Sequence, residues 1–327
     1  MTVTDDAQTA PPPRKDPATI GASLRFALPG SDVSVGPVGY LATERQRLES
    51  LTWEHFDVTR LSATIGAEIS GVDLTTELPD EVIAEIARAL ADHKVIFFRD
   101  QPLTAEQHVA FARRFGELEI HPFLPSNTGE PEVVRFAKSA DVGGYENGWH
   151  HDVTWRVAPS KGAVLHALEV PATGGDTVFS DAHAALENLD DDLRSRIDDM
   201  TAVHDFAQVF GHGMSADERA EMREKYPLVE HPVVITHEVT GKDLLYVNRF
   251  FVSHIKDMDR DENRDLINRL CRPFELLEHQ VRFRWEPDSV AFWDNRAVQH
   301  YACSDYWPDV RVMERASIIG GVPTRRR

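Results

Sequence analysis

Short apolar or alternating segments recur along the chain, and such segments are typical of β-strands. The clearest are 63–72, 94–98, 162–169, 233–237, 244–248, 281–285, 289–293 and 311–319. A cluster of short strands late in the chain, after mixed elements, indicates an α+β protein with a β-sandwich or barrel and helices outside it. In the turn 174–177, two glycines and an aspartate precede Thr177, where a strand resumes.

Three segments have a helical pattern. Residues 79–93 space their apolar side chains as an amphipathic helix, and the capping box of Thr104 and Gln107 starts a second helix that ends near Gly116. Residues 181–222 are predicted to be largely helical, with a loop at 210–213. We interpret this last segment as an insertion that forms a lid over a site.

The N-terminal segment differs in composition from the rest. Its first 40 or so residues are rich in proline, alanine, serine and glycine, which indicates a flexible or surface-draped arm. We therefore divide the chain into an extension, 1–52, and one domain, 53–327. One hypothesis is that the extension is an arm that packs on a neighbouring subunit. A homo-oligomer is therefore one of the alternatives.

The overall composition limits the classes of binding partner and the cellular location that we expect. The formal net charge of −19 disfavours binding to nucleic acid or to an anionic membrane surface. No segment has the length and apolarity of a signal peptide or a membrane span. Two cysteines, Cys271 and Cys303, give no disulfide framework. These features favour a soluble cytoplasmic protein with a small-molecule substrate.

Candidate metal chemistry centres on the segment GWHHDVTW, 148–155. His150 and Asp152 fall on one face of an extended segment, because side chains alternate with period two. Another His-x-Asp triplet, at 55–57, lies before the compact region and is interpreted as incidental. A second imidazole would complete a two-His-one-carboxylate iron(II) site, and His300, after an apolar strand, is the candidate.

Two arginines follow that histidine in the C-terminal strand. Arg311 and Arg315 are four residues apart, so both guanidinium groups can face one cavity and bind carboxylates. Together with GWHHDVTW, the segments PATGGDTVFSD, WDNRAVQHYACSDY and RVMERASIIGG resemble the TauD/TfdA (taurine/aryloxyacetate dioxygenase) family of iron(II)- and 2-oxoglutarate-dependent oxygenases. The resemblance extends from about residue 58 to about 323.

The resemblance implies a fold, a cofactor set and a reaction. The fold is a double-stranded β-helix, or jelly roll. Iron(II) would be held by His150, Asp152 and His300, and 2-oxoglutarate by Arg311 with Thr177. With O2, such an enzyme hydroxylates an aliphatic C–H bond and releases succinate and CO2. The signature 294–296 is expected to support the ligands or form a turn.

The resemblance also predicts the substrate pocket. His121 and Arg315 match residues that bind the anionic head of the substrate, and Phe210 and Phe250 match aromatic residues of the pocket wall. Three positions depart from taurine dioxygenases: Leu124 replaces a tyrosine, Glu146 an asparagine and Val209 a serine. The tail pocket is therefore expected to be more apolar, and Glu146 would pair with an amine if it points inward.

Three other readings are open from the sequence. A zinc hydrolase on the same scaffold would use the arginines for substrate, and a binding or scaffold protein would need no complete ligand set. In a halogenase, halide replaces the carboxylate ligand, so Asp152 disfavours that variant.

Overall fold

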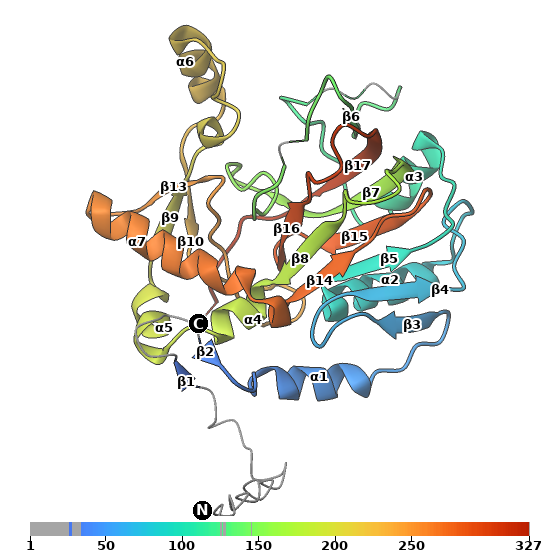
Figure 1. Cartoon of the computed structure of the whole chain (residues 1–327), viewed down its shortest axis with the longest axis horizontal. Helices are drawn as coiled ribbons and strands as arrows, with labels where there is room; N and C mark the ends of the chain where they lie inside the picture. The colour runs from blue at the N-terminus through green and yellow to red at the C-terminus, as the bar shows by residue number, and fades with distance from the viewer. Residues whose placement is uncertain (1–25, 28–33, 125, 127–128, 145, 327) are drawn as a thin grey trace, which may run out of the picture.

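The computed structural model describes residues 26–27, 34–124, 126, 129–144 and 146–326, and its centre is a pair of β-sheets (Figure 1). The larger sheet has the order β3-β4-β5-β15-β7-β17-β6, antiparallel except for the pair β4–β5. Its strands are β3 (Asp57–Arg60), β4 (Ala67–Ser70), β5 (Val95–Phe98), β15 (Val290–Asp294), β7 (Ser160–Glu169), β17 (Arg311–Ile319) and β6 (Val133–Lys138). The smaller sheet, in the order β14-β8-β16, contains β14 (Gln280–Phe283), β8 (Thr177–Asp181) and β16 (Val298–Ala302).

Alternation along the strands divides the core into two layers. In β5, β7, β15 and β17 of the larger sheet, odd-numbered side chains such as Phe97 and Trp293 face the smaller sheet and meet Phe179 and Phe283. The rings of Phe97 and Phe283 stack with centroids 3.9 Å apart. Even-numbered side chains such as Phe292 pack on the helical layer instead. This two-sheet arrangement is the jelly roll that the sequence resemblance implied.

Two helices cover the outer face of the larger sheet. They are α2 (Asp80–His93) and α3 (Ala105–Arg113), as the sequence predicted. Thr104 and Gln107 form the predicted capping box, with the hydroxyl of Thr104 accepting a hydrogen bond from the Gln107 N–H. Every helix among the described residues is too short or too polar to span a bilayer.

The segment 181–222 was predicted to be largely helical, and this is wrong at its centre. It contains α4 (Ala182–Glu187), α5 (Asp191–Ile197) and α6 (Ala216–Lys225), with strand β9 (Thr201–His204) and the 3₁₀ turn η3 (Phe206–Gln208) between α5 and α6. Strand β9 pairs with β10 (Val229–Pro232) and β13 (Val252–Ile255), both later in the chain. Long-range pairing therefore decided the conformation of 201–204.

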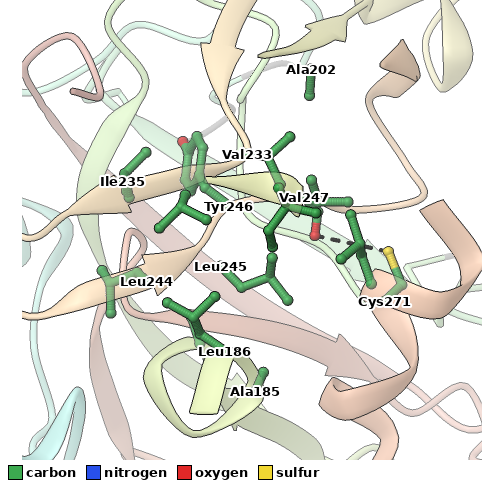
Figure 2. Close-up of a cluster of buried hydrophobic side chains, with 14 of the residues drawn as sticks. Ala185, Leu186, Ala202, Val233, Ile235, Leu244, Leu245, Tyr246, Val247 and Cys271 are labelled. Carbon is green, nitrogen blue, oxygen red and sulfur yellow. Dashed lines mark hydrogen bonds between the residues drawn. The ribbon is translucent and has the colours of Figure 1, made fainter. Parts of the chain in front are cut away.

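A second hydrophobic core lies beside the sheets (Figure 2). Leu186 of α4 packs there with β11 (Val234–Thr236), β12 (Asp243–Leu245) and α7 (Arg260–Cys271), a helix that the sequence analysis did not predict. The thiol of Cys271 donates a weak hydrogen bond to the carbonyl of Val247 at 3.9 Å. Two 3₁₀ turns, η4 (Arg272–Glu275) and η5 (Leu277–His279), connect α7 to the smaller sheet.

Part of the predicted extension is packed on the domain. Beyond the short pair β1 (Phe26–Ala27) and β2 (Ser34–Val35), it contains helix α1 (Leu41–Glu49), in which Leu41 and Leu48 are buried. Residues 1–25 and 28–33 lie outside the described residues. Packing of the compact body therefore begins before residue 53, inside the segment 1–52 that was assigned to the extension.

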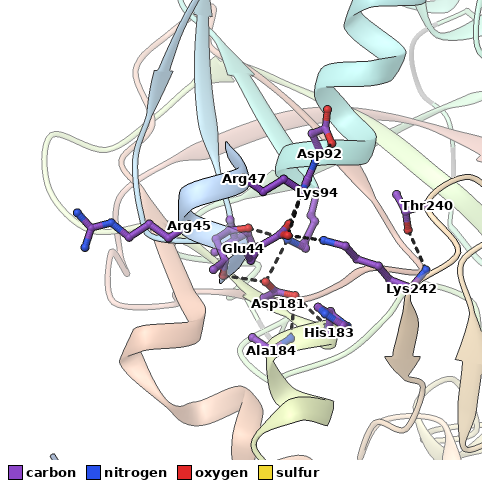
Figure 3. Close-up of polar contacts among 12 residues, drawn as sticks. Glu44, Arg45, Arg47, Asp92, Lys94, Asp181, His183, Ala184, Thr240 and Lys242 are labelled. Atoms are coloured by element: carbon purple, nitrogen blue, oxygen red, sulfur yellow. Dashed lines mark hydrogen bonds and ion pairs between the residues drawn. The ribbon is translucent and has the colours of Figure 1, made fainter. Parts of the chain in front are cut away.

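Glu44 of α1 is the centre of a charged cluster (Figure 3). Its carboxylate lies 2.9 Å from Arg47, 3.6 Å from Lys94 and 2.6 Å from Lys242. Lys94 in turn lies 3.2 Å from the buried carboxylate of Asp181, the N-cap of α4. The cluster therefore joins α1 to the ends of α2 and β8 and to the turn before β12.

Candidate active site

The three predicted metal ligands come from two segments that the fold brings together. His150 and Asp152 lie between β6 and β7, and His300 lies in β16. His150 and His300 form an antiparallel bridge, in which the N–H of His150 donates to the carbonyl of His300 at 3.2 Å and the N–H of His300 donates back at 2.9 Å. Two main-chain hydrogen bonds thus fix the relative position of the two histidines.

The ligand side chains converge on one point. Their candidate donor atoms all lie within 4.8 Å of one another, and no other such group occurs among the described residues. Nε2 of His150 is 3.7 Å from Oδ1 of Asp152, and Nε2 of His300 is 4.0 Å from Oδ2. Two nitrogens and one carboxylate oxygen are the donor set of a non-haem iron(II) centre.

The protonation states suit metal binding. Nδ1 of His150 lies 2.7 Å from the carbonyl of Gly148, so Nδ1 carries the proton and the lone pair of Nε2 faces the other ligands. Burial lowers the pKa of both His150 and His300, which keeps the imidazoles neutral. Burial opposes ionisation of Asp152, but the charge of Arg315 outweighs it and holds the pKa of Asp152 at about 2.

Hydrogen bonds hold both the side chain and the main chain of Asp152. Nη1 of Arg315 donates to the two carboxylate oxygens, at 3.0 and 2.9 Å. Asn295, which is fully buried, accepts from the N–H of Asp152 at 2.7 Å and donates to its carbonyl and to that of Ser160, each at 2.9 Å. The amide of Asn295 therefore positions the metal-binding loop, as expected for a member of the signature 294–296.

A small cavity adjoins the ligands on the side of β8 and β17. It has a volume of about 70 Å³ and includes His150, His300, Thr177 and Arg311 in its wall. Nε of Arg311 donates to the carbonyl of Gly175 at 3.1 Å, whereas its Nη2 is buried without a hydrogen-bond partner among the described residues. An unpaired buried guanidinium N–H favours a carboxylate as its partner.

Thr177 faces the same cavity. Its hydroxyl oxygen accepts a hydrogen bond from Nε1 of Trp285 at 2.9 Å, so the hydroxyl proton can point elsewhere. Thr177 and Arg311 are both buried, and they belong to different sheets. Thr177 and Arg311 would therefore offer a hydroxyl and a guanidinium to a carboxylate bound in this cavity.

A larger pocket of about 580 Å³ includes His150, Asp152 and Arg315 in its wall. At its inner end, His121 accepts the N–H groups of Phe123 and Leu124 at Nδ1, which assigns the ring proton to Nε2. Burial, with the charge of Arg315, lowers the pKa of His121 to about 3. His121 is thus a neutral hydrogen-bond donor beside the metal site.

Aromatic side chains line the rest of this pocket. Phe250 stacks on the imidazole of His150 with centroids 4.7 Å apart, and the ring of Phe210 lies 5.7 Å from that of His121. A side chain at Gly148 would displace Phe250 from this position, because a Cβ there would lie 2.1 Å from Cε1 of Phe250. Leu124 and Val209 also contribute to the wall, as their apolar character predicted.

Three side chains near or similar to the predicted ligands have other partners. His151 points away from the metal site into a buried cluster, with its ring 4.8 Å from that of Tyr246. His55 of the other triplet lies 2.9 Å from a carboxylate oxygen of Glu85 and joins no ligand group. Glu146 lines both cavities but lies 3.0 Å from the amine of Lys138.

The sequence analysis missed Lys138 together with its strand, β6. The side chains of β6 that face the site are Val134, Phe136 and Lys138, directly opposite Arg315, Met313 and Arg311 of β17. The alternation VVRFAK, 133–138, is the signal that could have revealed this strand.

Comparison with known proteins identifies the family. The sequence model of the taurine catabolism dioxygenase TauD, TfdA family matches residues 57–317. The chain belongs to the TauD/TfdA family. It is 36% identical over 292 residues to an alpha-ketoglutarate-dependent sulfate ester dioxygenase of Pseudomonas putida, covering 86% of this chain and 94% of the relative.

Two further proteins are similar over most of their lengths. An alkylsulfatase of Acinetobacter baylyi is 35% identical over 280 residues, which cover 83% of this chain and 87% of that protein. The crystal structure of a taurine dioxygenase from Burkholderia xenovorans aligns with a TM-score of 0.71 at 37% identity, over 83% of this chain and 93% of that one.

Family membership confirms the chemistry expected from the sequence. This TauD/TfdA protein is an iron(II)- and 2-oxoglutarate-dependent dioxygenase that uses O2, rather than a hydrolase or a binding protein. The set of His150, Asp152 and His300 fits its iron site. The unpaired Nη2 of Arg311 fits a carboxylate of 2-oxoglutarate.

Proposed function

We propose that the enzyme hydroxylates an aliphatic C–H bond of a monoanionic amphiphile, with a sulfate ester, sulfonate or carboxylate head and an apolar body. The observation that carries this proposal is the 580 Å³ pocket, in which Arg315 and His121 lie beside the metal ligands and Leu124, Val209, Phe210 and Phe250 line the wall. Relatives named for sulfate esters support the head group.

The roles of the residues follow from their contacts. His150, Asp152 and His300 hold iron(II), and Arg311 with Thr177 binds the distal carboxylate of 2-oxoglutarate. His121 donates its Nε2 proton to the anionic head. Arg315 shares its guanidinium between Asp152 and that head. The bound iron and 2-oxoglutarate supply the oxidation of the C–H bond by O2, with release of succinate and CO2.

Charge balance favours a single negative charge on the substrate. With iron(II) and the 2-oxoglutarate dianion bound, the charges of Asp152, Arg311 and Arg315 leave an excess of one positive charge, since Lys138 and Glu146 compensate each other. Buried charges are costly unless they are paired. A monoanion restores neutrality, whereas a zwitterion such as taurine adds an ammonium group to a largely apolar pocket.

The proposed lid is the segment from η3 to α6. Gln208, Val209, Phe210 and His212 from its first part line the substrate pocket. Closure of this segment over a bound amphiphile would exclude water from the iron site. The catalytic domain in this proposal is 53–327, with α1 as an additional brace.

A substrate screen tests the proposal. The protein is reconstituted anaerobically with iron(II) and 2-oxoglutarate, which should give a weak visible charge-transfer band. After O2 is admitted, succinate is measured with a series of unbranched alkyl sulfate esters, sulfonates and carboxylates, and with taurine. We expect kcat/KM to be at least tenfold higher for the longer apolar monoanions. A higher kcat/KM for taurine than for all of them would contradict the proposal.

A further inference from the structure

Two cations face each other at the inner end of the 2-oxoglutarate cavity. Lys138 of β6 and Arg311 of β17 are directly opposite in the antiparallel register, so their side chains share the inner face of the sheet. Both are 7% exposed and both line the 70 Å³ cavity. Like charges at opposite positions repel, and a carboxylate nearby offsets this repulsion.

Glu146 supplies that carboxylate. Its Oε1 lies 3.0 Å from Nζ of Lys138. Its main-chain carbonyl accepts hydrogen bonds from the N–H groups of Gly148, at 3.0 Å, and Ala302, at 3.4 Å. These bonds tie the backbone of Glu146 to β16 and to the metal-binding loop. The carboxylate is therefore held at the boundary between the cofactor cavity and the substrate pocket.

A carboxylate at this boundary has a consequence for specificity. Its side chain is only 28% exposed, and a partly buried carboxylate favours a cationic partner. A substrate with an ammonium group could provide that cation from the pocket side. Lys138 already provides it from within the protein.

We propose that Lys138 takes the place of a substrate ammonium group, so that the Lys138–Glu146 pair selects substrates without an amine. This role rests on the proposed function, because it concerns the same substrate pocket. When an aminosulfonate binds in the wild-type pocket, Lys138 already pairs with Glu146. The ammonium group of the substrate is then desolvated without gaining a carboxylate partner. An amine-free anion of equal size has no such cost.

The test compares two compounds of equal shape, taurine and propane-1-sulfonate, which differ by an ammonium group in place of a methyl group. Affinities for the anaerobic iron(II)/2-oxoglutarate complex are measured by calorimetry near pH 7.5, and kcat/KM is measured by succinate release. Wild type should prefer propane-1-sulfonate. Lys138→Met should shift the affinity ratio at least tenfold towards taurine, because Glu146 then lacks its internal cation.

Three further variants make the result specific. Lys138→Arg should keep the wild-type ratio, and the double variant Lys138→Met/Glu146→Gln should lose the shift towards taurine. Arg135→Met removes a cation from the same strand whose side chain pairs with Glu314 at 3.7 Å and joins neither cavity, so it should leave the ratio unchanged.

The outcomes separate the two proposals. An unchanged ratio in Lys138→Met, or a tenfold loss of 2-oxoglutarate affinity in that variant, would overturn the role of Lys138 and leave the proposed substrate class intact. A wild-type preference for taurine would overturn both.

Discussion

At the scale of single residues, the site depends on groups that hold the ligands as much as on the ligands themselves. Asp152 would be free to rotate in a loop without Arg315 at its carboxylate and Asn295 at its backbone. Groups that orient metal ligands affect metal affinity without touching the ion. Asn295 is therefore a positioning residue. Its replacement should lower metal affinity, whereas replacement of a buried asparagine elsewhere should lower stability alone.

Replacement Asn295→Ala should lower affinity for iron(II) or manganese(II) by about 10- to 100-fold. It should also destabilise the fold by roughly 1–3 kcal/mol, because buried main-chain groups lose partners. The matched control is Asn263→Ala, since Asn263 is also buried, hydrogen-bonds the main chain of Ile255 and lines neither cavity of the site. The control should lose stability but keep metal affinity. Equal metal affinities in the two variants would show that Asn295 has only a structural role.

Arg311→Ala should weaken 2-oxoglutarate binding at least tenfold while metal binding survives, because a charge-assisted contact in a buried site is lost. Arg282→Ala is the control, as Arg282 is exposed and pairs with Asp176 at 2.6 Å outside the cavity. Titration of 2-oxoglutarate into the metal-loaded protein, followed by the charge-transfer band, measures the change. An unaltered affinity in Arg311→Ala would place the carboxylate elsewhere.

At the scale of elements, strand alternation places the chemistry and α1 braces the scaffold. The odd-numbered residues Arg311, Met313 and Arg315 of β17 face the site, and the even-numbered Ala316 and Ile318 face the helices. Helix α1 buries Leu41 and Leu48 and also carries the charged side chain of Glu44. Glu44 meets three cations there, from its own helix and from two distant segments.

Glu44→Gln should destabilise the protein by about 1–2 kcal/mol near pH 7, a value between those of exposed and buried ion pairs. Burial disfavours the charged form of Glu44, but Arg47, Lys94 and Lys242 outweigh it and hold its pKa below the ordinary value of 4.5. A lowered folded-state pKa stabilises the protein above the unfolded-state pKa, and this stabilisation is lost as pH falls.

The stability difference between wild type and Glu44→Gln should therefore be constant from pH 8 to about 5 and shrink below about 4.5. Urea unfolding at several pH values measures it. Glu49→Gln, on the same helix but with 42% of its side chain exposed, should change stability less at every pH. A difference that grows on acidification would contradict the ion-pair explanation.

At the scale of the whole molecule, the site joins segments that are far apart in sequence. The ligands come from 148–152 and 300, and the cofactor cavity adds β6, β8 and β17. A ligand that binds only the folded state stabilises all of these contacts together. At one hundred times its dissociation constant, such a ligand adds about 2.7 kcal/mol to the free energy of unfolding.

Manganese(II), and then 2-oxoglutarate, should each raise Tm of the wild-type protein, measured by differential scanning calorimetry. Asp152→Ala should lose both increases in Tm, because 2-oxoglutarate binds to the metal and the metal needs Asp152 as a ligand. Arg311→Ala should keep the metal increment and lose most of the second. Retention of the metal increment in Asp152→Ala would argue against Asp152 as a ligand.

The sequence by itself determined the features that depend on local geometry. Period-two alternation put His150 beside Asp152 and Arg311 beside Arg315, and the capping box fixed the start of α3, because each involves residues within a few positions of one another. The family motifs extended this to His300. Tertiary structure alone decided which strands are neighbours. Register across β6 and β17 set Lys138 against Arg311, packing of distant loops put Asn295 against Asp152, and sheet pairing converted residues 201–204 from the expected helix into β9. These contacts depend on partners more than a hundred residues away or on sheet pairing, and local sequence carries no record of either.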